Sequence, residues 1–77
     1  MDTLAQSVGN SIAARRRLLD LTQQEVADRA GVSQKYISAL ERGERIPNLD
    51  TLDQIAGALG VPVRDLLPKT AVIGAAA

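Results

Sequence analysis

The strongest structural signal in the chain lies in residues 21–43, which read LTQQEVADRAGVSQKYISALERG. Thr22 and Glu25 have the spacing of a capping box, in which each side chain satisfies a free backbone amide at the start of a helix. Gly31 suits the left-handed residue that ends a helix, and Ser33 is a preferred N-cap for the next one. The stretch therefore predicts two short helices, joined by a tight glycine-containing turn that sets them at a steep angle.

Apolar periodicity predicts further helices on both sides of this stretch. Before it, Leu4, Val8 and Ile12 recur at every fourth position, which predicts a first helix over about residues 4–19. After it, Asn48 is a suitable cap for a fourth helix, whose apolar side is the clearest stripe in the sequence. That stripe consists of Leu49, Leu52, Ile55, Ala56 and Leu59.

A fifth short helix is expected over residues 63–67, between Pro62 near its first turn and Pro68, which stops it. The predicted fold is therefore all-α, with five helices in one domain over residues 1–68 and no internal repeat. The remaining residues 69–77 are apolar and of low complexity. We expect this tail to be frayed, or ordered only against a partner.

Composition limits the functions open to this domain. The chain has 77 residues, with 9 basic and 9 acidic side chains, so its formal net charge is zero. It contains no Cys and no His, which excludes disulfides, Cys/His metal sites, thiol catalysis and imidazole acid–base chemistry. No run approaches the roughly 18 apolar residues of a membrane-spanning helix, and no signal peptide is recognisable. We expect a cytoplasmic protein that is not an enzyme, uses no cofactor, metal or small-molecule ligand, and does not contact membranes.

The helix expected over residues 34–42 has a polar outer side, because Ile37 and Leu40 face the core. The outward positions are Gln34, Lys35, Ser38 and Ala39, with Tyr36 at the flank. Gln can hydrogen-bond adenine and Lys can hydrogen-bond guanine in the major groove of DNA. No acid lies between Asp28 and Glu41, so no carboxylate in that interval would repel phosphates. A DNA-binding face and the ordinary solvated side of a short helix are evenly balanced on this pattern alone.

Residues 21–43 resemble the helix-turn-helix of the lambda/434 repressor and Cro family, also called the XRE family. Shorter matches in the same order extend the resemblance over roughly residues 8–67. They are Ile12-Ala-Ala-Arg-Arg, Gln23-x-Glu25-x-Ala27, Leu40-Glu-Arg-Gly43, Pro47-Asn-Leu49 and Ile55-Ala-x-x-Leu59-Gly-Val61. The resemblance implies a lambda-repressor-like domain whose third helix enters the major groove of double-stranded DNA. The stretch 36–45 is most similar to small controller-protein-like regulators, which implies a homodimer on paired half-sites.

The resemblance also implies roles for individual residues. It assigns base reading to Gln34, Lys35 and Ser38, and contacts with the DNA backbone to Gln23, Tyr36, Arg42, Arg45 and the amides near Asn48. It further implies a partly buried salt bridge between Arg16 and Glu41, joining the first and third helices. The chain departs from the family pattern at Asp20, where glycine is common, so we expect a slightly different turn there.

A homodimer needs a contact surface, and the C-terminal third of the chain has more apolar side chains than the core of the monomer is expected to bury. At most two of Val63, Leu66 and Leu67 can point inward from one short helix, so we expect the dimer interface around them. The alternative is that all three complete the core of the monomer.

We therefore predict a sequence-specific transcriptional regulator that binds a pseudo-palindromic operator as a homodimer and controls its own gene. The alternative is a protein-interaction subunit, of the antitoxin or anti-activator kind, whose main partner is another protein. The zero net charge and the apolar tail favour this alternative. The side chains of Gln34 and Lys35 favour DNA.

Overall fold

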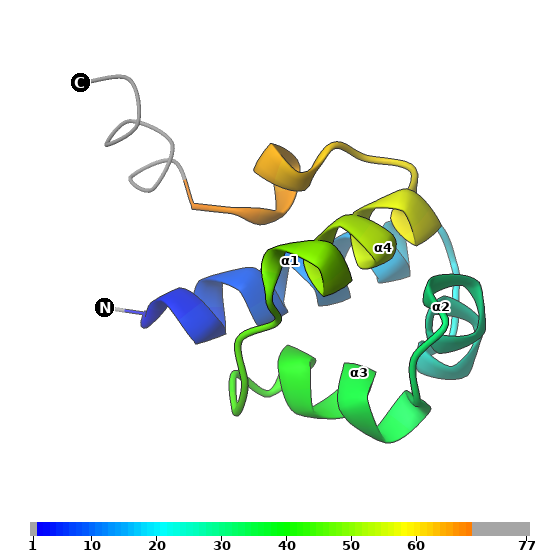
Figure 1. Ribbon diagram of the computed structural model, residues 1–77, viewed down its shortest axis with the longest axis horizontal. Coiled ribbons are helices and arrows are strands. Elements are labelled where there is room, and N and C mark those ends of the chain that lie inside the picture. Colours follow the sequence, from blue (N-terminus) through cyan, green and yellow to red (C-terminus); the bar gives the residue numbers. More distant parts are fainter. Residues whose placement is uncertain (1, 69–77) are drawn as a thin grey trace.

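The computed structural model describes residues 2–68, which form a small bundle of short helices (Figure 1). Within these residues there are four α-helices, one turn of 3-10 helix and no β-strand. The α-helices are α1 (Leu4–Leu18), α2 (Gln23–Ala30), α3 (Gln34–Glu41) and α4 (Leu49–Leu59), and the 3-10 turn is η1 (Val63–Leu66). The all-α prediction is confirmed. The expectation for the tail 69–77 lies outside the described residues.

The segment expected to form the fifth short helix forms only the 3-10 turn η1, so the predicted count of five helices is not confirmed. Few residues are available between Pro62 and Pro68. Leu67 precedes a proline and has the extended backbone that this position favours, with φ −99° and ψ 148°. The tighter 3-10 turn fits the interval, because its hydrogen bonds span only three residues. They run from the amide of Asp65 to the carbonyl of Pro62 and from that of Leu67 to Arg64.

Each α-helix in the described part of the chain begins with a side chain that caps it. The side-chain oxygen of the cap accepts a hydrogen bond from the backbone amide three positions later, which satisfies a donor that has no partner within the helix. The caps are Thr3, Thr22, Ser33 and Asn48. At α2 the capping box is reciprocal, since Glu25 Oε1 accepts from the amide of Thr22 at 2.9 Å.

The end of α1 is closed by Asp20, which is the one non-glycine residue with positive φ between residues 2 and 68, at +59°. Its amide donates to the carbonyl of Arg17. The next amide, that of Leu21, donates to the carbonyl of Arg16, which completes a Schellman motif. The turn therefore keeps the left-handed conformation that a glycine adopts easily, and the aspartate bears a steric cost there.

The core is aliphatic and lies between the helices. Helix α2 contacts α3 and α4, while α1 contacts α3 and η1. The largest fully buried side chains are Ile12, Val26, Ile37, Leu40, Ile55, Leu59 and Leu66. This packing holds α3 against α1 and α2 and leaves its opposite side open to solvent.

The crossing of α1 over α3 depends on Gly9, which is buried. A Cβ atom at this position would lie 2.1 Å from the carbonyl oxygen of Leu40 in α3. Because that oxygen belongs to the backbone, no side-chain movement could relieve the clash, and the two helices would have to separate. Glycine is therefore required here to let α1 approach α3 closely.

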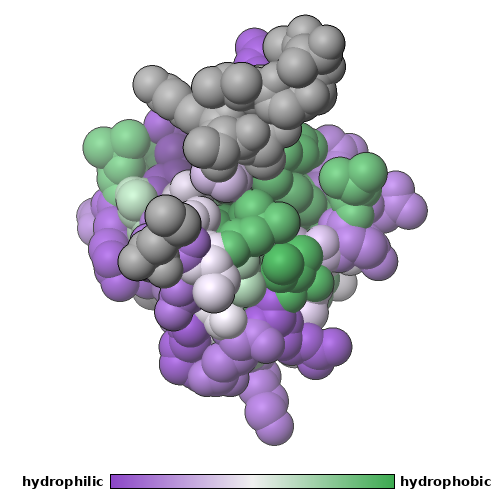
Figure 2. All heavy atoms as spheres, turned by 90° about the vertical axis from the view of Figure 1, so that its left-hand side faces the viewer, coloured by the Kyte–Doolittle hydropathy of each residue, from purple (hydrophilic) through white to green (hydrophobic). Residues whose placement is uncertain are grey.

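Three exposed apolar side chains belong to the starts of α1 and α4 and to the loop before α4, segments that lie toward one end of the bundle (Figure 1), and we call them the apolar end face. They are Leu4, Ile46 and Leu49, whose exposed fractions are 46%, 55% and 74%. Leu4 and Leu49 belong to the predicted apolar stripes, but each is the first residue of its helix and remains exposed. Figure 2 shows hydrophobic side chains gathered on this side of the molecule, where α1 and α4 begin.

Candidate nucleic-acid interface

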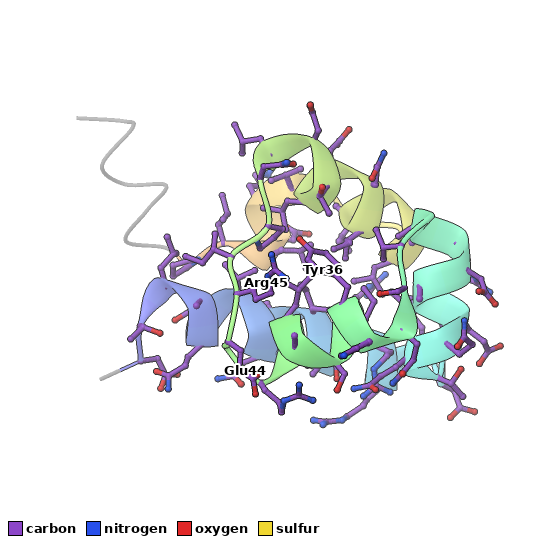
Figure 3. The ribbon with its side chains drawn as sticks, turned by 60° about the horizontal axis from the view of Figure 1, so that its bottom comes forward. Tyr36, Glu44 and Arg45 are labelled. Carbon is purple, nitrogen blue, oxygen red and sulfur yellow. The ribbon has the colours of Figure 1, made fainter. Side chains whose placement is uncertain are left out.

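The exposed side of α3 has the polarity expected from the sequence. Lys35 is exposed, and Gln34, Tyr36, Ser38 and Ala39 are half-buried. Ile37 and Leu40 are 0% and 1% exposed and fix the rotation of the helix against the core. Figure 3 views the molecule from the α3 side, with this helix in front. No carboxylate lies on α3 before its last residue, Glu41.

Glu41 forms an ion pair with Arg16 that joins the end of α3 to α1. Arg16 Nε donates to Glu41 Oε2 at 2.7 Å, and Arg16 Nη2 donates to Glu41 Oε1 at 3.0 Å. The two side chains are only 14% and 6% exposed. Arg16 Nη1 also donates to the carbonyl of Leu21 at 2.9 Å, which ties the pair to the turn between α1 and α2. The bidentate pair thus connects α1, α3 and the turn that precedes α2.

Both members of this pair stay charged in the fold. The hydrogen bond with Glu41 raises the pKa of Arg16 above its ordinary value, more than burial lowers it. Burial by itself raises the pKa of Glu41, but hydrogen bonds from Arg16 and Gln23, with the nearby positive charges, bring this pKa below its usual value. The carboxyl group of Glu41 is therefore ionised at neutral pH.

Gln23 and Gln34 continue the same hydrogen-bonded chain toward the surface. Gln23 Nε2 donates to Glu41 Oε1 at 3.0 Å. Gln34 Nε2 in turn donates to Gln23 Oε1 at 2.6 Å. The side chain expected to contact the DNA backbone from α2 is therefore already engaged with α3. Sequence spacing gave no indication of this connection, since its members come from three different helices.

Arg42 interacts with two nearby side chains, those of Glu44 and Ser38. It forms an ion pair with Glu44, with Nε and Oε2 separated by 2.6 Å, and both side chains are more than half exposed. The hydrogen bond between them raises the pKa of Arg42 and lowers that of Glu44. Arg42 also donates to the hydroxyl of Ser38. Sequence spacing does not reveal the role of Glu44, because a pair only two residues apart in a loop follows no helical periodicity.

Arg45 and Tyr36 lie together beside α3. The guanidinium carbon of Arg45 lies 5.6 Å from the centre of the Tyr36 ring, which is the distance of a cation–π contact (Figure 3). A shallow hollow beside this contact is lined by Ser33, Lys35, Tyr36, Ala39, Arg42, Glu44 and Arg45. The hollow therefore contains three cationic side chains and a single carboxylate.

The remaining predicted residues lie elsewhere on the fold. Asn48 caps α4, with Oδ1 accepting from the amide of Thr51 at 2.8 Å. Leu66 is 1% exposed, so it belongs to the core of the protomer and offers no surface to a partner. Val63 and Leu67 are half-buried against the same core. Of the three residues expected at a dimer interface, Val63 and Leu67 alone retain exposed surface.

Neither a cluster of metal-ligating residues nor a membrane-spanning helix occurs between residues 2 and 68. No group of three or more His, Cys, Asp or Glu residues in that range could hold a metal ion. No helix in the same range is both long and apolar enough to cross a membrane.

The sequence model of the helix-turn-helix family matches residues 12–66, which is most of the chain and includes all of α2, α3 and α4. The chain belongs to the Cro/C1-type helix-turn-helix family. Among curated relatives of this helix-turn-helix chain, an uncharacterised HTH-type transcriptional regulator of Sinorhizobium fredii is 49% identical over 63 residues. That match covers 82% of each protein.

Two other proteins similar to the chain are a phage repressor and a restriction–modification controller protein. The immunity repressor of Bacillus phage phi105 is 37% identical over 67 residues, a match that covers 87% of this chain but 46% of the repressor. The crystal structure of the restriction–modification controller protein C.AhdI from Aeromonas hydrophila has a TM-score of 0.79 at 27% identity. Its match covers 82% of this chain and 96% of the controller.

Proposed function

We propose that the chain is a sequence-specific DNA-binding transcriptional regulator that inserts α3 into the major groove. The observation that carries this proposal is the open side of α3, which has hydrogen-bonding side chains and no carboxylate before Glu41. Gln34 and Lys35 have the chemistry to read adenine and guanine, with Ser38 beside them. The family membership and the names of the relatives support the same function.

The DNA backbone is contacted, in this proposal, by residues at both ends of α3. Arg42 and Arg45 follow the helix, Tyr36 lies at its flank, and Gln23 starts α2 beside it. Near Asn48, the free amides at the start of α4 supply further donors for phosphates. Contacts of this kind position the protein and add affinity that does not depend on sequence.

Selection of bound sequences from random DNA, followed by substitution, tests the base-reading roles. Gln34→Ala and Lys35→Ala are each expected to weaken specific binding by about 1–3 kcal/mol and to relax preference at one base pair. Gln54→Ala, an exposed glutamine on α4, is the matched control and should bind like wild type. If both α3 variants keep the affinity and the base preference of wild type, α3 does not read bases.

A salt titration tests the backbone roles separately. Arg42→Ala and Arg45→Ala should weaken binding to all sequences alike and lower the slope of log affinity against log salt by about 1 each. Arg64→Ala, an exposed arginine in η1, is the control and should leave the slope unchanged. An unchanged slope in the first two variants would place their side chains away from phosphates.

We further propose that the protein binds a pseudo-palindromic operator as a homodimer, with the apolar end face and the adjoining Val63 and Leu67 region forming the interface. The end face lies beside the C-terminal end of α3 and does not cover its polar side (Figures 1 and 2). A two-fold axis there leaves both recognition helices free to enter successive major grooves, about 34 Å apart. Exposed apolar clusters on small proteins commonly mark such contacts.

Leu49→Asp tests this interface by sedimentation. Leu49 is 74% exposed, so the variant should fold, become monomeric and bind a full operator poorly. Leu18→Asp is the matched control, because Leu18 is 73% exposed at the other end of α1 and should not affect assembly. A Leu49→Asp protein that remains dimeric would contradict the proposed interface.

A protein-interaction subunit is the second candidate function, favoured by the apolar end face and the zero net charge. Binding to the DNA upstream of the protein's own gene distinguishes the two candidates. Specific retardation of that fragment, lost in Gln34→Ala, supports an autoregulatory DNA-binding protein. Absence of binding to this fragment and to every selected sequence would favour the protein-interaction role.

A further inference from the structure

The chain of hydrogen bonds from Arg16 to Gln34 has a direction that chemistry dictates. Glu41 is ionised and can only accept hydrogen bonds. The Gln23 amide that faces it must therefore present Nε2, as the 3.0 Å contact has it. The carbonyl oxygen of Gln23 is then the atom left to face Gln34, which must donate through its own Nε2 across the 2.6 Å contact.

This direction determines what Gln34 presents to a ligand. One N–H of its Nε2 is used by Gln23, so one N–H and the carbonyl oxygen remain. An adenine in the major groove offers a matching acceptor, N7, and a matching donor, the N6 amino group. A guanine offers two acceptors, O6 and N7, and only one of them could be satisfied.

The opposite direction would remove the preference. If Gln23 donated to Gln34, one lone pair of the Gln34 carbonyl oxygen would be used, and its second lone pair and both of its N–H groups would be free. Such a side chain could satisfy the acceptor and donor of adenine or the two acceptors of guanine. The charge on Glu41 prevents this arrangement, because a carbonyl oxygen of Gln23 turned toward the carboxylate would be repelled.

We propose that Glu41 is a positioning residue for base specificity, which acts through Gln23 to make Gln34 select adenine over guanine. This inference rests on the proposed base-reading function of α3. It assigns to the buried pair a second role, since the group that joins α1 to α3 also sets the donor pattern of a side chain that it does not touch.

The first experiment observes the chain of hydrogen bonds in the free protein, where DNA plays no part. Side-chain amide signals of Gln23 and Gln34 are recorded by ¹H–¹⁵N NMR in wild type, Glu41→Gln and Gln24→Ala. Glu41→Gln replaces the carboxylate with an amide of the same shape, which can donate or accept. Both signals should shift in Glu41→Gln. They should remain in place in Gln24→Ala, because the side chain of Gln24 donates to Asp28 and takes no part in this chain of hydrogen bonds. An unmoved Gln34 signal in Glu41→Gln would overturn the proposal.

The second experiment measures base preference at the pair that loses specificity in Gln34→Ala. Wild type should prefer adenine over guanine there by about 5- to 150-fold. Glu41→Gln and Gln23→Ala should both lose most of that ratio, while Gln24→Ala keeps it. Gln23→Ala leaves the Arg16–Glu41 contact in place, so its result does not depend on the stability of Glu41→Gln.

The outcomes separate the inference from the function beneath it. An adenine preference that survives in both Glu41→Gln and Gln23→Ala overturns the positioning role and leaves DNA binding intact. A wild-type preference for guanine overturns it as well. If Gln34→Ala changes preference at no position, the base-reading function itself fails and takes the specificity role with it.

Discussion

Replacing Glu41 with alanine should destabilise the fold sharply, because it leaves the Arg16 guanidinium charged and nearly buried. The variant loses the bonds that Glu41 accepts from Arg16 at 2.7 and 3.0 Å, and the bond that it accepts from Gln23. Breaking a buried pair in this way costs about 3–5 kcal/mol. Arg16 is 14% exposed and keeps its bond to the carbonyl of Leu21, so we expect the lower end, about 3 kcal/mol.

That loss is a large part of the stability of a domain of this size. A chain of 77 residues is expected to have a free energy of unfolding of about 4–12 kcal/mol. The thermal midpoint should fall by roughly 12–24 °C, from about 4–8 °C per kcal/mol. Circular dichroism at increasing temperature measures the midpoint, and urea unfolding measures the free energy of unfolding. The slope of that free energy against urea concentration should be unchanged in the variant.

Two variants make this measurement specific. Glu44→Ala removes the exposed ion pair with Arg42 and should hardly change the midpoint, because such pairs are screened by water. Arg16→Met combined with Glu41→Leu replaces both charges by apolar side chains and should recover most of the lost stability. The reasoning is refuted if Glu41→Ala unfolds at the same temperature as Glu44→Ala.

Three further predictions concern the backbone and pH. Gly9→Ala should prevent stable folding, because its Cβ would lie 2.1 Å from the carbonyl oxygen of Leu40. Gly57→Ala, whose Cβ would have nothing within 4 Å, should stabilise α4 by about 0.5–1 kcal/mol. Urea midpoints that shift in the same direction in both variants would contradict this. Asp20→Gly should stabilise the fold by up to about 1 kcal/mol and so raise the thermal midpoint, because glycine adopts the left-handed conformation of residue 20 without steric cost. A lower midpoint would show that the aspartate side chain stabilises the turn. Burial raises the pKa of Glu41 less than its hydrogen bonds lower it, so its contribution to stability is present above about pH 4.3 and is lost as the pH falls through the lower folded value. Urea unfolding of Glu41→Gln should accordingly depend less on acidic pH than unfolding of wild type.

The sequence predicted the positions of the helices closely, because the signals that start and end them are local. Thr22, Ser33 and Asn48 each cap a helix by accepting a hydrogen bond from the amide three residues later. The capping box between Thr22 and Glu25 can likewise be predicted from their spacing alone. The polar side of α3 was predictable for the same reason, since Ile37 and Leu40 fix its rotation.

Features that depend on where elements end or meet were not predictable. Leu49 continues the apolar stripe of α4, but periodicity does not reveal that the core stops before the first turn of the helix. Leu66 was assigned to a dimer interface because the length of a 3-10 turn, and the rotation that it gives each side chain, cannot be read from spacing. The connection of Glu41 to Gln34 through Gln23 requires three helices to meet, which no single pattern encodes.

The ion pair between Arg42 and Glu44 has a consequence for how a regulator of the proposed kind searches a genome. A DNA phosphate that reaches Arg42 must first displace a carboxylate of the protein's own chain. Every site on DNA demands this exchange, the operator included, so Glu44 reduces the sequence-independent affinity that Arg42 contributes, and the zero net charge adds no long-range attraction. With about 10⁶–10⁹ competing sites in a genome, a weaker attraction to each of them reduces the amount of protein held on random DNA. In a regulator of the proposed kind, the exposed Glu44 would thus compete with DNA phosphates for Arg42.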